Sequence, residues 1–316
     1  MAKYRVFVDG QEGTTGLEIN DRLHKRDDVG ILPIDPGKRK DPDERKKLIH
    51  EADVVFLCLP DDAAKESVSL ADNSSARIID CSTAHRTADG WAYGIPELSA
   101  EHRKSIQNSK RVSNPGCFAT GFNMLMYPLV KESIVPADYP VSCHAVTGYS
   151  GGGKKLIGIF ESEANKPKLE SPSFYSLGLS HKHLPEMRKR SLLAHNPVFT
   201  PIVCNYYRGM TVAVPLCADL LPNKTTAFEI GKFYRDYYHG QKFVKAFPAN
   251  NQDSFEWGYL NAQGCNFTNN IELYTFGDDR QILVMARLDN LGKGASGAAV
   301  QNMNVMLGLD DTCYLS

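Results

Sequence analysis

Short apolar runs recur along the first third of the chain, separated by polar or helix-compatible stretches. Residues 4–9 alternate and are rich in Val, Phe and Tyr, and further apolar runs follow at 31–34, 54–59 and 77–80. Such runs are typical of parallel strands that are buried on both faces of a sheet. Residues 17–23 carry the spacing of a helix. The pattern predicts a Rossmann-type, doubly wound α/β domain over roughly the first 115 residues.

The pattern changes after residue 117. A helix is predicted near 225–238, before Gly240, and a small-residue helix at 296–308. Longer strands are predicted at 139–147, 197–204, 209–217, 269–275 and 281–288. Polar or glycine-containing segments separate several of these strands. We therefore expect a second, α+β domain that has a mixed, largely antiparallel sheet with helices on one face.

Composition narrows the class of protein. The 316 residues suggest two domains, and 42% hydrophobic with 23% charged residues is ordinary for a globular chain. Because 36 basic side chains are balanced by 37 acidic ones, we expect no general affinity for nucleic acid or anionic membrane. No apolar run approaches the roughly 20 residues that span a bilayer, and the N-terminus enters a strand pattern without room for a signal peptide. Eight scattered cysteines without a Cys-x-x-Cys pair favour a cytoplasmic protein with reduced thiols.

A glycine-rich turn follows the first predicted strand and opens the first predicted helix. Its glycines, Gly10, Gly13 and Gly16, permit a tight turn and let backbone N–H groups approach a pyrophosphate. Thr14 and Thr15 lie between them and are further candidates for this contact. The spacing departs from the commoner Gly-x-Gly-x-x-Gly. A glycine-rich turn without a ligand is the alternative interpretation.

The residues after the second predicted strand bear on which nucleotide binds. Asp35 is expected to close that strand, where an acid would bond the ribose 2′-hydroxyl of NAD. Lys38 and Arg39 follow and suit a 2′-phosphate. The two interpretations compete, because an acid repels a phosphate, and the basic pair could equally be solvated. We favour NADP.

Cys117 is the strongest candidate nucleophile. It follows the chain-turning residues 114–116, Asn-Pro-Gly, and precedes apolar residues at helical spacing over 118–129. A thiol at a helix N-terminus is favoured as a thiolate, because the helix dipole and N–H groups stabilise the negative charge. The alternative, a buried structural thiol, suits the other seven cysteines better.

A thiolate nucleophile needs a proton-transfer partner. His181, His183 and Glu186 crowd six residues, and His85 follows the fourth predicted strand. A His-x-His pair can bind metal, but no cysteine or further histidine nearby in the sequence completes a ligand set, so we expect no metal and a catalytic role. In an extended loop the two histidines would point to opposite sides, and only one would face Cys117.

The chain resembles the N-acetyl-gamma-glutamyl-phosphate reductase family over nearly its whole length, in that family's shorter form. The resemblance rests on these pieces, in this order: 9–16 Asp-Gly-Gln-Glu-Gly-Thr-Thr-Gly, 81–87 Cys-Ser-Thr-Ala-His-Arg-Thr, 94–98 Gly-Ile-Pro-Glu-Leu, 113–120 Ser-Asn-Pro-Gly-Cys-Phe-Ala-Thr, 147–154 Thr-Gly-Tyr-Ser-Gly-Gly-Gly-Lys, 181–186 His-Lys-His-Leu-Pro-Glu, 208–210 Arg-Gly-Met and 289–295 Asp-Asn-Leu-Gly-Lys-Gly-Ala. The longer form carries Ser-Gly-Ala-Gly-Arg where residues 150–154 stand. Lys154 keeps the charge but cannot form the bidentate fork of an arginine.

The resemblance implies an NADP-dependent acyl-phosphate reductase of arginine biosynthesis. Cys117 would attack the acyl phosphate and form a thioester, hydride from NADPH would reduce it, and a semialdehyde would leave. His181 matches the family's acid/base with His183 as the alternative, and Glu186 would orient the imidazole. Further site residues implied by the resemblance are Gly10, Gly13, Thr14, Thr15, Gly16, Lys38, Arg39, Ser82, Ser150, Gly151, Gly153 and Asn290 for the cofactor, and Asn114, His183 and Arg208 for the substrate.

The resemblance also implies an organisation. Residues 1–116 with 293–316 would form the NADP-binding domain, and residues 117–292 the catalytic and dimerisation domain of a homo-oligomer, dimer or tetramer. Its substrate would be a small acyl phosphate.

The alternative functions are an aspartate-semialdehyde dehydrogenase or an aminoadipyl-phosphate reductase, a nucleotide-binding sensor that lost catalysis, and a cysteine hydrolase. The intact Cys117 and His181 argue against the sensor, and the glycine-rich turn argues against the hydrolase.

Overall fold

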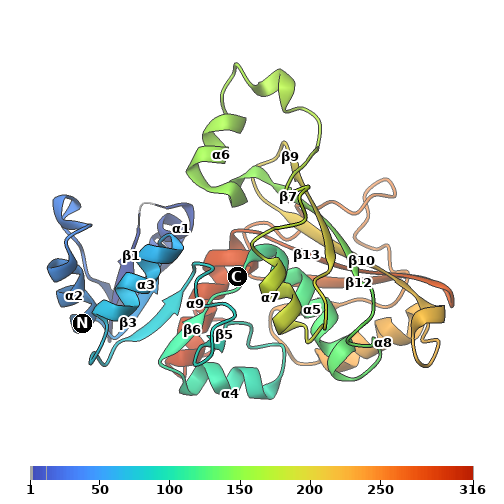
Figure 1. Cartoon of the computed structure of the whole chain (residues 1–316), viewed down its shortest axis with the longest axis horizontal. Coiled ribbons are helices and arrows are strands. Elements are labelled where there is room, and N and C mark those ends of the chain that lie inside the picture. Colours follow the sequence, from blue (N-terminus) through green and yellow to red (C-terminus); the bar gives the residue numbers. More distant parts are fainter. Residues whose placement is uncertain (1–2, 12, 316) are drawn as a thin grey trace. The chain divides into compact units, whose positions relative to one another are not determined.

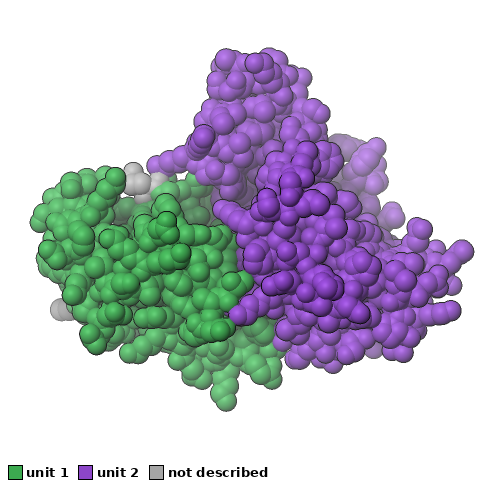
Figure 2. All heavy atoms as spheres, in the orientation of Figure 1, with its two compact units in different colours: residues 1–116, 295–316 green, residues 117–294 purple. Residues whose placement is uncertain are grey.

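The computed structural model describes residues 3–11 and 13–315. The chain divides into two units (Figure 2). Unit 1 comprises residues 1–116 and 295–316, and unit 2 comprises residues 117–294. Among the helices of the described ranges, none is long and apolar enough to cross a membrane.

Unit 1 is built on a six-stranded sheet in which every pairing is parallel. Its strand order is β2 (Val29–Ile31), β1 (Tyr4–Asp9), β3 (Val54–Leu57), β4 (Arg77–Asp80), β6 (Arg111–Ser113) and β5 (Ala92–Tyr93). Its helices are α1 (Thr14–Leu23), α2 (Pro42–Glu51), α3 (Asp61–Leu70), α4 (Ala100–Asn108) and α9 (Gly297–Met306) (Figure 1). This confirms the predicted parallel, doubly wound sheet.

Alternate residues of the central strands pack into two different apolar clusters. Val6 and Phe56 belong to a cluster with residues of α1, α4 and α9. Phe7 and Val55 belong to a second cluster with residues of α2 and α3. Because successive strand residues point to opposite faces, helices cover both faces of the sheet. The continuous apolar runs in the sequence follow from this double burial.

The prediction of a strand at 31–34 was wrong in its bounds. The buried Val29 pairs with Tyr4, and β2 ends at Ile31. Pro33 has no backbone N–H and cannot continue the ladder. Asp35 therefore lies outside the strand that it was expected to close. Instead, its Oδ1 accepts from the Gly37 N–H at 2.7 Å and caps a short 3₁₀ helix, η1 (Pro36–Lys38).

Unit 2 is built on a seven-stranded sheet. Its order is β11 (Val244–Ala246), β12 (Ile271–Gly277), β13 (Gln281–Leu288), β10 (Met210–Cys217), β7 (Ser142–Gly148), β9 (Val198–Cys204) and β8 (Ser173–Phe174). The pairs β11–β12 and β7–β9 are parallel and the other four are antiparallel. The prediction of a mixed, largely antiparallel sheet is confirmed.

The helices of unit 2 are α5 (Cys117–Lys131), α6 (Gly153–Phe160), α7 (Leu184–Arg190) and α8 (Ala227–Tyr237). Thr226 and Glu229 form a reciprocal capping box at the start of α8. Tyr234 of α8 donates from its hydroxyl to the Leu125 carbonyl of α5 at 2.8 Å. Short 3₁₀ helices lie at η2 (Tyr149–Gly152), η3 (Lys166–Lys168) and η4 (Ala218–Leu220), and η5 (Gly292–Ser296) is a π-helix.

Candidate active site

Cys117 is the first residue of α5, which begins unit 2. Its side chain is half-buried. The segment that follows β13 passes directly beside it, because a Cβ built on Gly294 would lie 2.8 Å from the Cys117 Cβ. Only glycine fits there. A thiol at a helix N-terminus, half-exposed and closely flanked by backbone, is an arrangement suited to a nucleophile.

His181 lies beside the helix turn that carries Cys117. Its ring packs edge-on against Phe118, with the centroids 5.7 Å apart, and against Phe199 at 5.1 Å. Burial and then the neighbouring charge of Lys182 lower the pKa of His181 to about 4. The imidazole is therefore neutral at neutral pH.

One hydrogen bond sets the tautomer of this histidine. The Nδ1 atom of His181 accepts from the backbone N–H of His183 at 3.1 Å. Because an accepting ring nitrogen carries no hydrogen, neutral His181 bears its hydrogen on Nε2. His181 can therefore donate from Nε2 to a substrate oxygen.

The expectation that His181 and His183 point to opposite sides was wrong. The segment is not extended, since His183 has φ −83° and ψ −11° and precedes α7 in a turn. The two rings lie 4.7 Å apart, and both pack edge-on against Phe118. His183 is the more deeply buried, with 5% exposed. Glu186 is buried in the first turn of α7, and its proposed action on His181 stays a prediction.

Asn290 ties three segments of unit 2 together. Its side chain donates to the Ser150 hydroxyl at 3.0 Å and accepts from the Gly209 N–H at 2.8 Å. A Cβ on Gly151 would lie 3.5 Å from the same amide, and Gly153 has φ +73° at the start of α6. Three of the residues predicted to bind the cofactor, Ser150, Gly151 and Asn290, therefore form one cluster, centred on a buried amide.

Arg208 forms a buried ion pair. Its Nη1 donates to Asp289 Oδ2 at 3.1 Å, and its guanidinium lies over the Phe267 ring at 4.5 Å. Asp289 also accepts from the backbone N–H groups of Phe267 and Leu291. The structure thus gives Arg208 a packed role in unit 2, and its expected contact with substrate stays a prediction. The carboxylate at 289 was missed as its partner, because the two residues are far apart in sequence.

The glycine-rich turn of unit 1 has the geometry expected of a phosphate cradle. Gly10 has φ +87°, and a Cβ there would lie 2.4 Å from the Cys58 carbonyl oxygen. A Cβ on Gly16 would lie 2.5 Å from the Gly10 carbonyl oxygen. Thr14 and Thr15 open α1, where backbone N–H groups have no intrahelical acceptor. The Thr14 hydroxyl is buried and makes no hydrogen bond within the described residues, so the turn fits a dinucleotide phosphate.

Lys38 and Arg39 follow in and after η1. Lys38 is exposed and forms a 3.4 Å ion pair with Glu44, and Arg39 is half-buried. Because the Asp35 carboxylate already accepts from Gly37, it is directed into its own turn. The basic pair therefore remains the candidate for a 2′-phosphate.

Ser82 belongs to a network at the carboxyl end of β4. Asp80 is fully buried. Its carboxylate accepts from the Ser82 backbone N–H at 2.9 Å and from the Ser82 hydroxyl at 2.8 Å. It is also hydrogen-bonded to His85 Nδ1 at 2.6 Å. The His85 ring stacks on Trp91 at 4.1 Å. Sequence reasoning missed Asp80, which is recognisable only as a polar residue that ends an apolar strand.

Asn114 is buried in unit 1. Its amide donates to the Ala295 carbonyl at 2.9 Å and accepts from Asn302 at 3.1 Å. Its own carbonyl accepts from Arg86. These bonds hold the end of β6 to the segment that enters α9. Its expected contact with substrate stays a prediction.

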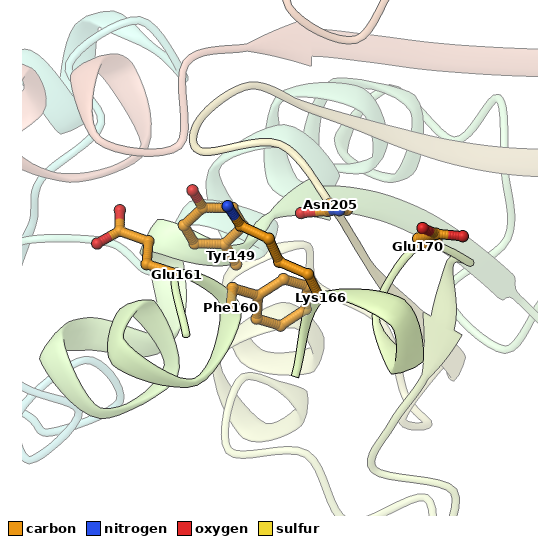
Figure 3. A pocket seen from close by; sticks show the side chains of 6 residues that line it. All are labelled: Tyr149, Phe160, Glu161, Lys166, Glu170 and Asn205. Carbon is orange, nitrogen blue, oxygen red and sulfur yellow. The ribbon is translucent and has the colours of Figure 1, made fainter. Parts of the chain in front are cut away.

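A pocket of about 360 Å³ lies next to η2 (Figure 3). Its lining residues are Tyr149, Phe160, Glu161, Lys166, Glu170 and Asn205. The Tyr149 and Phe160 rings stack at 4.8 Å. The predicted site residues do not line it, although Tyr149 precedes Ser150. Within the described ranges, no cluster of three or more His, Cys, Asp or Glu side chains could hold a metal ion.

Comparisons with known families agree with this layout. A family model described as semialdehyde dehydrogenase, dimerisation domain, matches residues 117–290. A second, described as semialdehyde dehydrogenase, NAD binding domain, matches residues 37–106. These two matches cover the Cys117 site and part of the sheet that carries the glycine-rich turn.

Curated relatives match over nearly the full length. The chain is 46% identical to N-acetyl-gamma-glutamyl-phosphate reductase 2 of Nostoc sp., covering 98% of this chain and 99% of that one. It is 44% identical to N-acetyl-gamma-glutamyl-phosphate reductase of Chelativorans sp., over 96% and 98%. Among solved structures, aspartate semialdehyde dehydrogenase II from Vibrio cholerae has a TM-score of 0.73 at 14% identity, over 97% and 99%. That likeness shows the fold.

Proposed function

Because this chain belongs to the N-acetyl-gamma-glutamyl-phosphate reductase family, we propose that it reduces N-acetyl-glutamyl 5-phosphate to N-acetylglutamate 5-semialdehyde and phosphate, with NADPH, in arginine biosynthesis. The observation that carries the proposal is Cys117 at the N-terminus of α5 with a neutral His181 packed beside the same turn. Full-length similarity to named reductases supports the choice of substrate over the aspartyl and aminoadipyl alternatives.

The chemistry divides between the two side chains. The Cys117 thiolate attacks the acyl carbon, and the bond to the phosphate oxygen breaks. Phosphate leaves, and the acyl group stays on Cys117 as a thioester. NADPH, when bound, supplies the hydride that reduces this thioester. The resulting thiohemiacetal then releases the semialdehyde and regenerates the thiol.

His181 serves as the acid/base of this sequence. Its Nε2–H can donate to the carbonyl oxygen as negative charge develops there, which is the main way that such sites stabilise tetrahedral intermediates. The aromatic rings of Phe118 and Phe199 exclude water on two sides. His183 holds the ring through its backbone N–H, and Glu186 would orient the imidazole.

The cofactor residues fall into two groups. In unit 1, the Gly10–Gly16 turn with Thr14 and Thr15 would hold the pyrophosphate. In unit 2, the cluster of Ser150, Gly151, Gly153 and Asn290 would hold the nicotinamide. Lys38 and Arg39 would bind the 2′-phosphate and favour NADP over NAD. Ser82, held by Asp80, completes the set.

We extend the proposal to the organisation of the protein. Residues 1–116 with 293–316 would bind the coenzyme, and residues 117–292 would carry the catalytic and dimerisation functions. The description of the matching family model supports the second assignment. We expect a dimer or tetramer in the cytoplasm, acting on a small molecule. Sedimentation of the purified protein measures the oligomeric state.

A substrate panel tests the activity. NADPH oxidation is followed with the acyl phosphates of acetylglutamate, glutamate, aspartate and aminoadipate, and we expect the acetylglutamyl compound to be preferred. Cys117→Ser should remove nearly all turnover, because an alcohol is a far weaker nucleophile than a thiolate, yet leave NADPH binding intact. Cys217→Ser, at an exposed cysteine, is the matched control. Preference for another acyl phosphate, or full activity in Cys117→Ser, would overturn the proposal.

A second test concerns the coenzyme. Replacing Lys38 and Arg39 together by Ala should weaken NADPH binding by roughly 2–4 kcal/mol. Charge-assisted hydrogen bonds are worth about 1.5–3 kcal/mol each, and the exposure of Lys38 to solvent reduces their sum. NADH binding should barely change. The exposed neighbours Lys46 and Lys47, changed together to Ala, control for general charge. Equal losses for both coenzymes would refute the role of the pair.

A further inference from the structure

Two cysteines of unit 1 lie side by side at the carboxyl ends of adjacent parallel strands. Leu57 of β3 pairs with Asp80 of β4, and Cys58 and Cys81 are the next residues of the two strands. The Cys81 N–H donates to the Leu57 carbonyl at 2.9 Å, which continues the register. Because register partners on adjacent strands point to the same face of a sheet, the two side chains project side by side.

This placement matches the reach of a disulfide. Neighbouring strands lie about 4.8 Å apart, and disulfide-bonded cysteines have Cα atoms about 4.4–6.8 Å apart. Both side chains are half-buried and pack at the margin of the apolar cluster that α1, α4 and α9 complete. Part of each residue is therefore exposed to solvent. By contrast, Cys143 and Cys265 are 0% and 3% exposed.

The pair also adjoins the glycine-rich turn. The Cys58 N–H donates to the Asp9 carbonyl at 2.7 Å, and the Cys58 carbonyl is the group that leaves no room for a side chain on Gly10. Cys81 precedes Ser82, which Asp80 holds by two hydrogen bonds. A link between the two sulfurs would join the segment under the turn to the segment that carries Ser82.

We propose that Cys58 and Cys81 form a reversible disulfide, a modification site for peroxides within the nucleotide-binding unit. Hydrogen peroxide is the oxidant: the Cys81 sulfur attacks one peroxide oxygen, the O–O bond breaks, and a sulfenic acid and water form. The Cys58 sulfur then displaces the hydroxyl from Cys81, which leaves a disulfide and a second water. Two thiols have lost two electrons and two protons to one peroxide, and an external thiol reverses the change by exchange.

The order of attack follows from the environment of Cys58. The contact with Cys81, and then burial, raise the pKa of the Cys58 thiol well above its usual range. Cys58 therefore keeps its proton, and we expect Cys81 to be the sulfur that attacks the oxidant first. Cys58 acts as the resolving thiol.

The disulfide draws the two neighbouring sulfurs to a bond of about 2.05 Å. The Cys58 carbonyl lies against Gly10, so a change in the Cys58 backbone on forming this bond is passed to the glycine-rich turn. This consequence depends on the proposed coenzyme site. We expect NADPH affinity to fall by about 5- to 150-fold, the usual range for coupling between two sites.

The test uses the full chain with Cys117→Ser, so that oxidation of the nucleophile does not interfere. The protein is treated with hydrogen peroxide, digested without reductant and mapped by mass spectrometry, and NADPH affinity is measured by fluorescence. We expect a peptide linking Cys58 to Cys81, lighter by two hydrogens and cleaved by dithiothreitol, with weakened NADPH binding. Cys58→Ser should abolish the link and leave sulfenic acid on Cys81, whereas Cys217→Ser should change nothing.

The outcomes separate the two proposals. Absence of the linked peptide after peroxide treatment, or oxidation of Cys81 beyond sulfenic acid while Cys58 stays a thiol, would overturn the disulfide. A linked protein with unchanged NADPH affinity would overturn its effect on the coenzyme site. Failure of the untreated protein to bind NADPH would count against the proposed function instead, because the peptide map does not depend on coenzyme binding.

Discussion

The neutral state of His181 makes the stability of unit 2 depend on pH in a defined way. Its pKa is about 4 in the folded chain, against about 6.5 in an unfolded one. As pH falls below 6.5, His181 binds a proton in the unfolded state but stays neutral in the folded state until the pH approaches 4. The contribution to stability is therefore complete above pH 6.5 and is lost as pH falls toward 4.

The size of the effect follows from the shift. Each pH unit in this window is worth at most 1.36 kcal/mol, and the half-exposed ring is partly screened by solvent, so we expect about 1 kcal/mol between pH 7 and pH 5. Of the charged and titratable neighbours, Lys182 reinforces the shift, while the rings of His183 and Tyr175 pack nearby.

The assay is urea unfolding at both pH values. The wild-type chain should lose about 1 kcal/mol more on acidification than His181→Gln, because glutamine does not titrate. The exposed His195→Gln is the control and should behave like the wild type. If His181→Gln loses as much stability as the wild type, or if the His181 ring protons titrate near pH 6.5 by NMR, the argument for a desolvated, neutral imidazole fails.

The remaining predictions concern buried contacts and a helix cap. Arg208→Ala should lower the free energy of unfolding by about 3–5 kcal/mol, because Asp289 keeps its charge in a buried site. Adding Asp289→Asn should recover part of this loss. Strictly additive losses of the two variants in urea unfolding would contradict the ion pair. Gly16→Ala should cost about 1–3 kcal/mol by crowding, whereas Gly13→Ala, with 3.7 Å to its nearest neighbour, should be tolerated; equal losses would contradict the crowding. Thr226→Ala removes the cap of α8 and should cost about 1 kcal/mol in thermal melts, with Thr226→Ser restoring it.

Elements with a clear period were predictable from the sequence. The predicted bounds of β1, β4 and β13 agree with the structure, because each is an apolar run flanked by polar residues or glycine. The second strand was predicted two residues late, since Leu32 and Ile34 prolong the apolar run beyond the last paired residue. The apolar pattern alone does not show that backbone pairing stops before Pro33 while the apolar run continues to Ile34.

The site was predictable as a set of residues but not as a set of contacts. The positions of Cys117 at a helix start and of Gly10 at a tight turn follow from local sequence. The pairing of Arg208 with Asp289, 81 residues apart, depends on β10 lying beside β13. The turn at His183 depends on where α7 begins. Such facts arise from tertiary packing, which local periodicity does not encode.

The interrupted course of the chain has a consequence for its synthesis. Met303 and Val305 of α9 complete an apolar cluster that begins with Val6, and Asn304 bonds the buried Arg26 at 2.7 Å. Residues 1–116 therefore leave the ribosome before α9 is made. Their apolar cluster stays incomplete until α9 is synthesised. Unit 2 is continuous and can fold during that delay. We infer that unit 1 is completed after unit 2, and that a nascent chain stalled before residue 297 would expose apolar surface to chaperones.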